Sequence, residues 1–379
     1  MQSFYQNFKL GVLGGGQLGR MLIQSAIDFN VDVHILDPDE HAPCRNLAKK
    51  FAIGKLTDFD TVYNFGKDCD VLTIEIENVN TDALKQLQKE GKKVFPQPEV
   101  IELIQDKGRQ KLFYINNFIP TAPFERVENK TAVAKMKQFL PAVNKLRKEG
   151  YDGRGVQILR TENDLERAFD APGILEKLID FEKELSVIVA RNESGQIKAF
   201  PVVELVFHPE HNLVEYLFAP AEITEQQSHR AKEIAEEVIK RLDMVGLLAV
   251  EMFLTKDGEI LVNEIAPRTH NSGHQTIESS YTSQFEQHLR AILNMPLGPT
   301  GSKIPAAMVN LLGEDGHQGM AQYSGLEKIL ALEGAKVHLY GKKYTKPFRK
   351  MGHVTIIDQD VDRLKEKARF VKDNLKVIS

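Results

Sequence analysis

The chain has 379 residues, of which 42% are hydrophobic and 27% are charged, as expected for a globular protein with two or three domains. Its formal net charge of −4 gives no electrostatic case for binding nucleic acid or an anionic membrane. The two cysteines exclude a disulfide framework, no apolar run is long enough to span a bilayer, and the N-terminus lacks a secretory-signal pattern, so we expect a cytoplasmic protein.

The first hundred residues alternate between strand-like and helix-like patterns. Strands are predicted at 8–13, 31–36, 71–74 and 93–95, and helices at 17–28 and near 82–89. Alternation of this kind is typical of βαβ units, so it predicts a parallel sheet. From about residue 111 the strands come in hairpins, for example 142–146 with 156–159, and a turn is expected at 192–195. A long amphipathic helix is predicted at 225–242, and a last block has strands at 306–312, 336–340 and 354–358 followed by a helix.

A glycine loop, Gly14–Gly19, follows the first predicted strand and opens the first predicted helix. It fits the G-x-G-x-x-G pattern, and Asp37 stands at the end of the next strand. Glycines here let the backbone approach an anion at a helix N-terminus. Three interpretations are open: a nicotinamide dinucleotide site, a site for a substrate phosphate, or a tight turn without a ligand. Because the following residues show no hydride-transfer site, we favour the substrate phosphate.

A second glycine-rich segment, EGYDGRG at 149–155, joins the strands 142–146 and 156–159. Lys145 precedes it and Arg154 lies within it. Glycines make such a loop mobile and let it lie close to a ligand. The segment is therefore either a cationic flap over a polyphosphate or an ordinary surface hairpin.

The stretch 247–268 carries the most specific chemistry. Two apolar runs flank Asp257-Gly258, a strong signal for a two-residue hairpin turn. In that register Glu251 lies opposite Glu264, with Cβ atoms roughly 4.5–5.5 Å apart. Facing carboxylates in apolar strands are typical of a Mg²⁺ site that is completed by substrate phosphates. The alternative is a half-solvated sheet with two outward carboxylates.

Four motifs occur together and in a fixed order: GGGQLGRM at 14–21, EGYDGRG at 149–155, NEIAPRTHNSGH at 263–274 and RKMGH at 349–353. With them the chain resembles, over nearly its whole length, the N5-carboxyaminoimidazole ribonucleotide synthetases, ATP-grasp carboxylases of purine biosynthesis. The resemblance implies a mixed α/β and α+β molecule with an ATP-grasp fold. Its domains would be an N-terminal parallel-sheet (Rossmann-like) domain at 1–110, a small lid domain at 111–185, and an ATP-grasp core with a C-terminal α+β substrate domain at 186–379.

The resemblance also implies a nucleotide site. Residues expected to contact ATP are Arg109 and Lys145 on the phosphates, Gly150, Tyr151, Asp152, Gly153, Arg154, Gly155 and Val156 in the flap, Glu176, Lys177, Leu178 and Ile179 at the adenine, and Glu184 at the ribose. Glu251 and Glu264 would hold Mg²⁺ or Mn²⁺, with Asn263 beside them. Strict strand alternation, however, points Asn263 to the opposite face of the ribbon.

The substrate implied by the resemblance is aminoimidazole ribonucleotide. Its phosphate would lie on Gly15, Gly16, Gln17 and Leu18 with Lys343 and Arg349, and Glu75 or Glu77 would contact the imidazole. Asn271, with Arg268 and His274, would surround bicarbonate, and Tyr151 and Arg154 would close over the site. We expect Arg268, His274, Tyr151 and Arg154 to be the catalytic set; alternatively, His274 only braces a turn.

The implied reaction has two stages. ATP phosphorylates bicarbonate, and the carboxyphosphate that results releases CO₂ to the amine of the ribonucleotide. The released phosphate or His274 would accept the proton of the amine. The family suggests a homodimer. The alternatives are another ATP-grasp carboxylate–amine ligase, such as a formate-dependent purine enzyme, and an NAD-dependent oxidoreductase that uses Gly14–Gly19.

Overall fold

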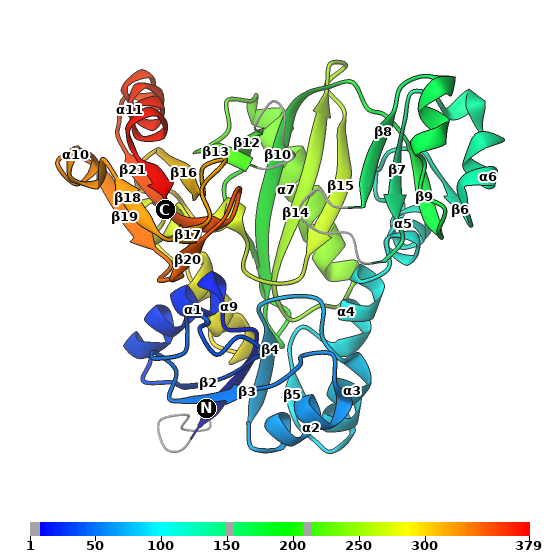
Figure 1. Cartoon of the computed structure of the whole chain (residues 1–379). Coiled ribbons are helices and arrows are strands. Elements are labelled where there is room, and N and C mark those ends of the chain that lie inside the picture. The colour runs from blue at the N-terminus through cyan, green and yellow to red at the C-terminus, as the bar shows by residue number, and fades with distance from the viewer. Residues whose placement is uncertain (1–7, 149–154, 208–213) are drawn as a thin grey trace.

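The computed structural model describes residues 8–148, 155–207 and 214–379. Figure 1 shows three layers of sheet: a small parallel sheet near the N-terminus, a large antiparallel sheet through the centre, and a four-stranded sheet at the opposite edge. Among the described helices, none combines the length and hydropathy needed to cross a bilayer.

The N-terminal sheet is parallel, with strand order β3-β2-β1-β4-β5, as the alternating pattern predicts. Its strands are β1 (Lys9–Leu13), β2 (Asp32–Asp37), β3 (Lys50–Ile53), β4 (Val71–Ile74) and β5 (Lys93–Val94), and its helices are α1 (Gln17–Asp28), α2 (Phe59–Lys67) and α3 (Thr81–Lys89). The edge strand β3 and helix α2 have no counterpart among the predicted elements. Strand β3 has no fully buried residue, so it lacks the apolar run that reveals an inner strand.

Two helices, α4 (Pro98–Ile104) and α5 (Lys107–Asn116), lead into the four-stranded antiparallel sheet. Its order is β6-β9-β7-β8. The strands are β6 (Phe124–Val127), β7 (Ala142–Leu146), β8 (Val156–Leu159) and β9 (Gly173–Lys177), with α6 (Lys130–Ala134) beside them. Strands β7 and β8 pair as the predicted hairpin, and the loop between them lies largely outside the described residues.

The large sheet runs β15-β14-β10-β12-β13-β16-β21-β19, with β11 on β10. Its strands are β10 (Phe181–Arg191), β11 (Ile197–Ala199), β12 (Val203–Phe207), β13 (Val214–Ala219), β14 (Gly246–Thr255), β15 (Ile260–Ala266), β16 (Ala306–Leu312), β19 (Ala335–Leu339) and β21 (Lys350–Ile357). Helix α7 (Glu225–Arg241) buries its apolar stripe against β10, β14 and β15. Helix α9 (Gln284–Ile292) packs on both α1 and β14, so it joins the N-terminal domain to the large sheet.

The remaining elements cover the C-terminal end of the large sheet (Figure 1). They are α8 (Thr276–Ser279), β17 (Gly319–Met320), β18 (Gln322–Ser324), α10 (Leu326–Leu330), β20 (Tyr344–Thr345), α11 (Val361–Asn374) and β22 (Lys376–Ile378). The mixed α/β and α+β class predicted from the sequence is confirmed.

The β14–β15 hairpin differs from its predicted turn. The Thr255 N–H donates to the Glu259 carbonyl at 2.9 Å, so the loop has three residues, with Gly258 at φ +83°. Near the turn, Leu254 pairs with Ile260 and Met252 with Val262. A β-bulge at Asn263 then adds one residue to β15, and Glu251 pairs with Glu264 after all. The two-residue turn was wrong, but the pairing of the two glutamates is confirmed.

Candidate functional site

Three glutamates line one face of three neighbouring strands. Glu251 on β14 pairs with Glu264 on β15 and with Ser186 on β10, and Glu184 stands two residues from Ser186 on the same face. Burial and then the charge of Glu264 raise the pKa of Glu251 to about 7. Burial and then Glu251 raise the pKa of Glu184 to about 8. We call Glu184, Glu251 and Glu264 the acidic face; its negative charges oppose one another and favour a cation.

The acidic face alone does not make a complete metal shell. Within the described residues, no group of three or more His, Cys, Asp and Glu side chains is arranged to hold a metal ion. Mg²⁺ is commonly held by one or two carboxylates, with waters and substrate phosphates supplying the other oxygens. The paired oxygens of Glu251 and Glu264 therefore fit Mg²⁺ or Mn²⁺ bound together with a nucleotide.

The bulge also settles which way Asn263 points. The Lys145 ammonium lies 3.0 Å from the Asn263 amide oxygen, and Asn263 lines the same small space as Glu264. A bulge residue and its neighbour both oppose one residue of the partner strand, so strict alternation fails here. The prediction that Asn263 faces away from the site was wrong.

Three lysines stand beside the acidic face. Lys107 and Lys111 come from α5 and Lys145 from β7. Lys107 pairs with Glu264, while Lys111 and Lys145 hold the two oxygens of Glu176 at 2.8 and 2.7 Å. Burial opposes ionisation of Glu176, but the two lysines outweigh it and lower its pKa to about 2. We call Lys107, Lys111 and Lys145 the lysine cluster.

The lysine cluster is closed by its own ion pairs. The space that it lines with Glu176, Asn263 and Glu264 is too small for a water molecule. An incoming polyphosphate would therefore have to replace these carboxylates as the partner of the lysines. Lys107 and Lys111 were not predicted, although their i, i+4 spacing places them on one helix face and was a usable signal.

Arg109 does not join the lysine cluster. It lies two residues from both Lys107 and Lys111 on α5, and residues two apart on a helix do not face the same way. Its side chain is 61% exposed and lies 4.0 Å from Asp106. The carboxylate of Asp106 is instead held by Arg147 at 2.7 Å. A contact between Arg109 and a phosphate stays a prediction that this arrangement does not favour.

In the segment predicted to bind adenine, Glu176–Ile179, several polar groups already bond to other parts of the chain. The Lys177 N–H donates to the Pro123 carbonyl at 2.8 Å, and the Leu178 N–H donates to the Pro141 carbonyl at 3.0 Å. The Glu176 carboxylate lies between two lysines. An adenine bound here would therefore have to use other groups of the segment, such as those of Ile179.

The glycine loop is occupied by side chains of the chain itself. The Glu75 carboxylate accepts hydrogen bonds from the N–H groups of Gly16 at 2.6 Å and Leu18 at 3.3 Å. The Asp37 carboxylate accepts from the Gly15 N–H at 2.7 Å. Burial raises the pKa of Glu75 to about 7 against these bonds. The structure thus places Glu75 where we predicted a phosphate, and of the predicted loop residues Gln17 remains half-exposed.

The segment after β15 brings several predicted residues toward the acidic face. Arg268 forms an ion pair with Glu77 at 2.8 Å. The residue predicted to bind bicarbonate thus contacts one of the two predicted to bind the imidazole. Both amide atoms of Asn271 are buried, and neither has a hydrogen-bond partner among the residues that the structure describes. His270, which was not predicted, lies 3.6 Å from Glu251 and is linked through Ser272 to Ser186. Its presence in the motif THNSGH was the available signal.

His274 is buried among aromatic rings. It is 1% exposed, and its ring centroid lies 4.8 Å from that of His353 and 5.9 Å from that of Phe285. Burial, followed by the nearby charge of Lys350, lowers its pKa to about 3, so the imidazole is neutral. Its Nδ1 lies 3.1 Å from the amide nitrogen of Gln284. With a pKa this low, the ring is a weak proton acceptor near neutral pH.

The last predicted residues fall into three groups. Lys343 is exposed, and the Arg349 guanidinium donates to the Tyr344 carbonyl at 2.8 Å. Their loop reaches α1, since a Cβ at Gly341 would lie 3.4 Å from the Arg20 guanidinium. Gly155 adopts φ +74°, and Val156 pairs with Lys145. The predictions for Gly150, Tyr151, Asp152, Gly153 and Arg154 lie outside the described residues.

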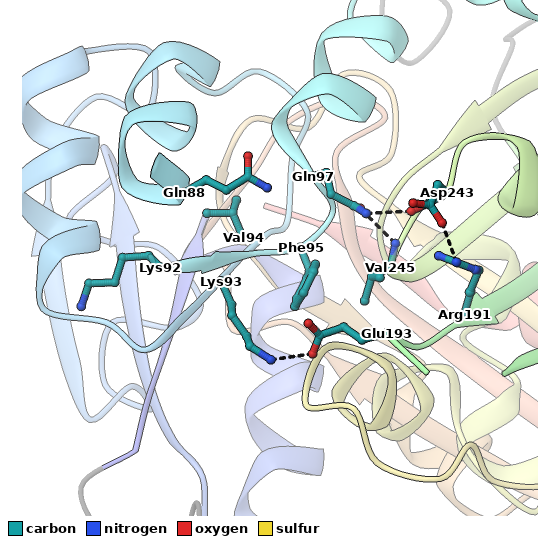
Figure 2. A pocket seen from close by; sticks show the side chains of 10 residues that line it. All are labelled: Gln88, Lys92, Lys93, Val94, Phe95, Gln97, Arg191, Glu193, Asp243 and Val245. Carbon is teal, nitrogen blue, oxygen red and sulfur yellow. Dashed lines mark hydrogen bonds and ion pairs between the residues drawn. The ribbon is translucent and has the colours of Figure 1, made fainter. Parts of the chain in front are cut away.

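A separate open hollow of about 350 Å³ lies where the N-terminal sheet meets the large sheet (Figure 2). None of the predicted site residues lines it. Lys93 pairs there with Glu193 at 2.6 Å and Arg191 with Asp243 at 2.5 Å. The Gln97 amide bonds to the backbone of Asp243 and Val245. The Lys93–Glu193 ion pair and the Gln97 bonds tie the N-terminal region to the large sheet, and the hollow is lined by three cationic and two anionic side chains.

Three family models match consecutive parts of the chain. They are a ribonucleotide synthetase preATP-grasp domain at residues 8–105, an ATP-grasp domain at 112–285 and a phosphoribosylaminoimidazole carboxylase C-terminal domain at 306–367. A chloroplastic phosphoribosylaminoimidazole carboxylase of Vigna aconitifolia is 40% identical over 94% of this chain and 65% of its own length. The chain therefore spans about two thirds of that relative.

Other relatives match over almost their full length. An N5-carboxyaminoimidazole ribonucleotide synthase of Bacillus subtilis is 37% identical over 95% of this chain and 94% of its own. The crystal structure of an N5-carboxyaminoimidazole ribonucleotide synthetase from Thermotoga maritima is 46% identical, with a TM-score of 0.91 over 98% of this chain and 99% of that one. An Aspergillus clavatus enzyme in complex with ADP and 5-aminoimidazole ribonucleotide is 33% identical, with a TM-score of 0.89 over 97% and 98% of the two chains. The chain therefore belongs to the family of N5-carboxyaminoimidazole ribonucleotide synthases, within the ATP-grasp enzymes.

Proposed function

We propose that this protein uses ATP and bicarbonate to carboxylate the amine of 5-aminoimidazole ribonucleotide, giving N5-carboxyaminoimidazole ribonucleotide, ADP and phosphate. The observation that carries the proposal is the acidic face next to the lysine cluster. One binds the cation and the other the phosphates that an ATP-dependent transfer needs. Family membership supports the identity of the substrate.

The phosphoryl transfer depends on charge balance. In the proposed complex, Glu251 and Glu264 would hold Mg²⁺ or Mn²⁺, which would supply positive charge against the transferring phosphoryl group. Lys107 would leave Glu264 and neutralise phosphate oxygens. The Lys145 ammonium would do the same, either leaving Glu176 or bonding to both groups. Glu184, whose raised pKa keeps it partly protonated near neutral pH, faces the ribose hydroxyls. Each of these groups acts by position and charge.

Bicarbonate is proposed to lie between the metal and the segment 268–274. Arg268 has a guanidinium fork that suits its oxygens and would exchange its present bonds to Glu77 and the Thr269 carbonyl for them. The unpaired amide of Asn271 offers one donor and one acceptor at the same place. The γ-phosphoryl group passes to a bicarbonate oxygen, and the carboxyphosphate that forms breaks into CO₂ and phosphate. The amine then bonds to CO₂, and its proton passes to the released phosphate.

The ribonucleotide is proposed to lie between the N-terminal sheet and the large sheet. Glu75, fixed by the glycine loop, would contact the aminoimidazole. Lys343 and Arg349 would hold the phosphate at the exposed rim of the loop near Gln17. A phosphate deeper in the loop requires Glu75 to leave the N–H groups of Gly16 and Leu18. Tyr151 and Arg154 remain proposed to close the site.

The decisive experiment is ADP release with each substrate omitted in turn. We expect turnover with Mg²⁺, ATP, bicarbonate and aminoimidazole ribonucleotide, with incorporation of labelled bicarbonate into an acid-labile product. Replacement of bicarbonate by formate should abolish the product. Equal ADP release with formate, or with no ribonucleotide, would refute the proposal.

The alternative of a nicotinamide-dependent oxidoreductase lacks support from the loop geometry. The Asp37 carboxylate, which such enzymes use for a ribose, already accepts from the Gly15 and Asp39 N–H groups. We further propose a homodimer in the cytoplasm, where the buried thiols of Cys44 and Cys69 would stay reduced. Light scattering on a sizing column tests the dimer.

A further inference from the structure

The segment 270–274 is held by one buried side chain, that of Gln284 at the start of α9. Gln284 is 0% exposed. Its amide oxygen accepts from the His270 N–H at 2.8 Å, and its amide nitrogen donates to the His270 carbonyl at 2.7 Å. Gly273 lies against the same amide, since a Cβ there would stand 2.6 Å from the Gln284 Cδ. The Gln284 amide therefore contacts the segment at both His270 and Gly273.

The two backbone bonds fix which way the amide points. A backbone N–H can only donate and a carbonyl can only accept, so the oxygen and nitrogen of Gln284 cannot exchange places. The second hydrogen of the amide nitrogen then faces the Nδ1 atom of His274, 3.1 Å away. An N–H donor opposite Nδ1 requires that Nδ1 carry no proton. In a neutral imidazole the proton must then be on Nε2.

The environment of the ring supports a single arrangement. His274 packs against Phe285 and His353 and is neutral because burial lowers its pKa. Rotation of the ring by half a turn would place a C–H against the amide N–H and leave a buried donor without a partner. The backbone N–H of Gln284 is itself anchored on the Thr276 hydroxyl at 2.9 Å, and that hydroxyl donates to the Gly273 carbonyl at 2.5 Å.

We infer that Gln284 is a positioning residue that locks His274 as the Nε2–H tautomer, so that His274 serves the site as a hydrogen-bond donor to an anion and not as a general base. The tautomer follows from the geometry alone, and the role toward the anion rests on the proposed function. A donor at this place would stabilise carboxyphosphate or the phosphate released from it. The proton of the amine then has to leave with that phosphate.

The test reads the tautomer directly in the resting protein. Histidines labelled with ¹⁵N are observed by long-range ¹H–¹⁵N correlation, and the signal missing from His274→Asn assigns the ring. We expect an unprotonated Nδ1 and a protonated Nε2 between pH 6 and 8. A protonated Nδ1 would overturn the inference, whatever the enzyme turns out to catalyse. Addition of Mg·ADP and inorganic phosphate should shift the Nε2–H proton signal; an unchanged signal would refute the donor role.

Gln287 offers a matched control on the same helix. It is also 0% exposed, and its amide pairs with the Gly298 backbone at 2.9 and 3.0 Å, with no histidine bonded to it. We expect Gln284→Met to give a mixture of tautomers and to lower kcat about 10–100-fold with little change in the KM for ATP. Gln287→Met should lose similar thermal stability and keep both the tautomer and kcat. Equal loss of kcat in the two variants would mean that Gln284 acts only through stability.

Discussion

The acidic face and the glycine loop both contain buried carboxylates, but the surroundings of these carboxylates differ. On the acidic face, burial and, after it, repulsion between the carboxylates raise the pKa values of Glu184 and Glu251. In the glycine loop, the buried carboxylates of Glu75 and Asp37 accept hydrogen bonds from backbone N–H groups that would otherwise be free for a ligand. In the first region like charges face one another, and in the second the carboxylates satisfy the backbone donors. What a region will bind thus depends on the charge that its own chain leaves unbalanced.

The largest effect is expected at the acidic face. Glu264→Gln removes one of the two facing charges and should lower kcat/KM by about 10²–10³-fold, since a bound metal contributes several kcal/mol of charge stabilisation. Glu259→Gln, on the exposed tip of the same hairpin, is the control and should be active. Steady-state ADP release at saturating Mg²⁺ measures both. Near-normal turnover of Glu264→Gln would remove the metal from this face.

The charge conflict should also appear as a pH dependence of stability. Folding raises the pKa of Glu251 from 4.5 to about 7, so the folded state binds the proton more tightly than the unfolded state. Without Mg²⁺, stability should therefore fall as pH rises from about 4.5 to about 7. Glu251→Gln should be nearly neutral at the low end and stabilising by roughly 1–3 kcal/mol at pH 8. Denaturant unfolding at the two pH values tests this, and equal differences at both would contradict the assignment.

The glycine loop should respond through Glu75. A Cβ at Gly16 would lie 2.4 Å from a Glu75 oxygen, so Gly16→Val must expel the carboxylate from the loop. We expect the KM for the ribonucleotide to rise about tenfold, the equivalent of one ordinary hydrogen bond, while the KM for ATP stays unchanged. A raised KM for ATP alone would show that the loop serves the nucleotide. Tighter binding of the ribonucleotide in Glu75→Ala would show that Glu75 competes with the substrate phosphate.

The smallest effect is expected from Asp37→Asn. The amide keeps an oxygen for the Gly15 N–H but loses the charge, so the loop should be destabilised by only about 0.5–1.5 kcal/mol. Thermal unfolding together with the KM for the ribonucleotide measures the change. A large loss of activity at normal stability would indicate that Asp37 contacts a ligand.

Much of the fold was predictable because its signals are local. The predicted helix 17–28 coincides with α1, and the strands 71–74, 142–146 and 306–312 coincide with β4, β7 and β16. Strand β3 was missed because an edge strand without a buried residue has no apolar period. The pairing of Glu251 with Glu264 was right because two departures cancel, the longer turn and the bulge at Asn263, whereas the pairs between the bulge and the turn are shifted by one residue.

The sequence predicted many residues of the candidate site, but it did not predict which of them bond to one another. Glu251 and Glu264 follow from pairing along a strand, which is a local rule. The hold of Glu75 on Gly16 and of Arg268 on Glu77 joins segments far apart in the chain, and single-sequence patterns do not encode such contacts. The contact of Arg109 with a phosphate stays a prediction, but the helical phase of α5, visible in the sequence, turns Arg109 away from Lys107 and Lys111. Lys107 and Lys111 were missed because this phase was not applied.

The bulge at Asn263 divides the β14–β15 ribbon into two parts with different tolerance to changes of length. The tip residues Lys256, Asp257 and Gly258 are exposed, and the pairs below them do not depend on the number of loop residues. We expect short insertions there to leave the enzyme intact. Deletion of Asn263 would instead remove the bulge and the amide oxygen that lies 3.0 Å from the Lys145 ammonium, while Glu264 would still lie opposite Glu251. Homologues with length variation in this ribbon should therefore carry it at the tip.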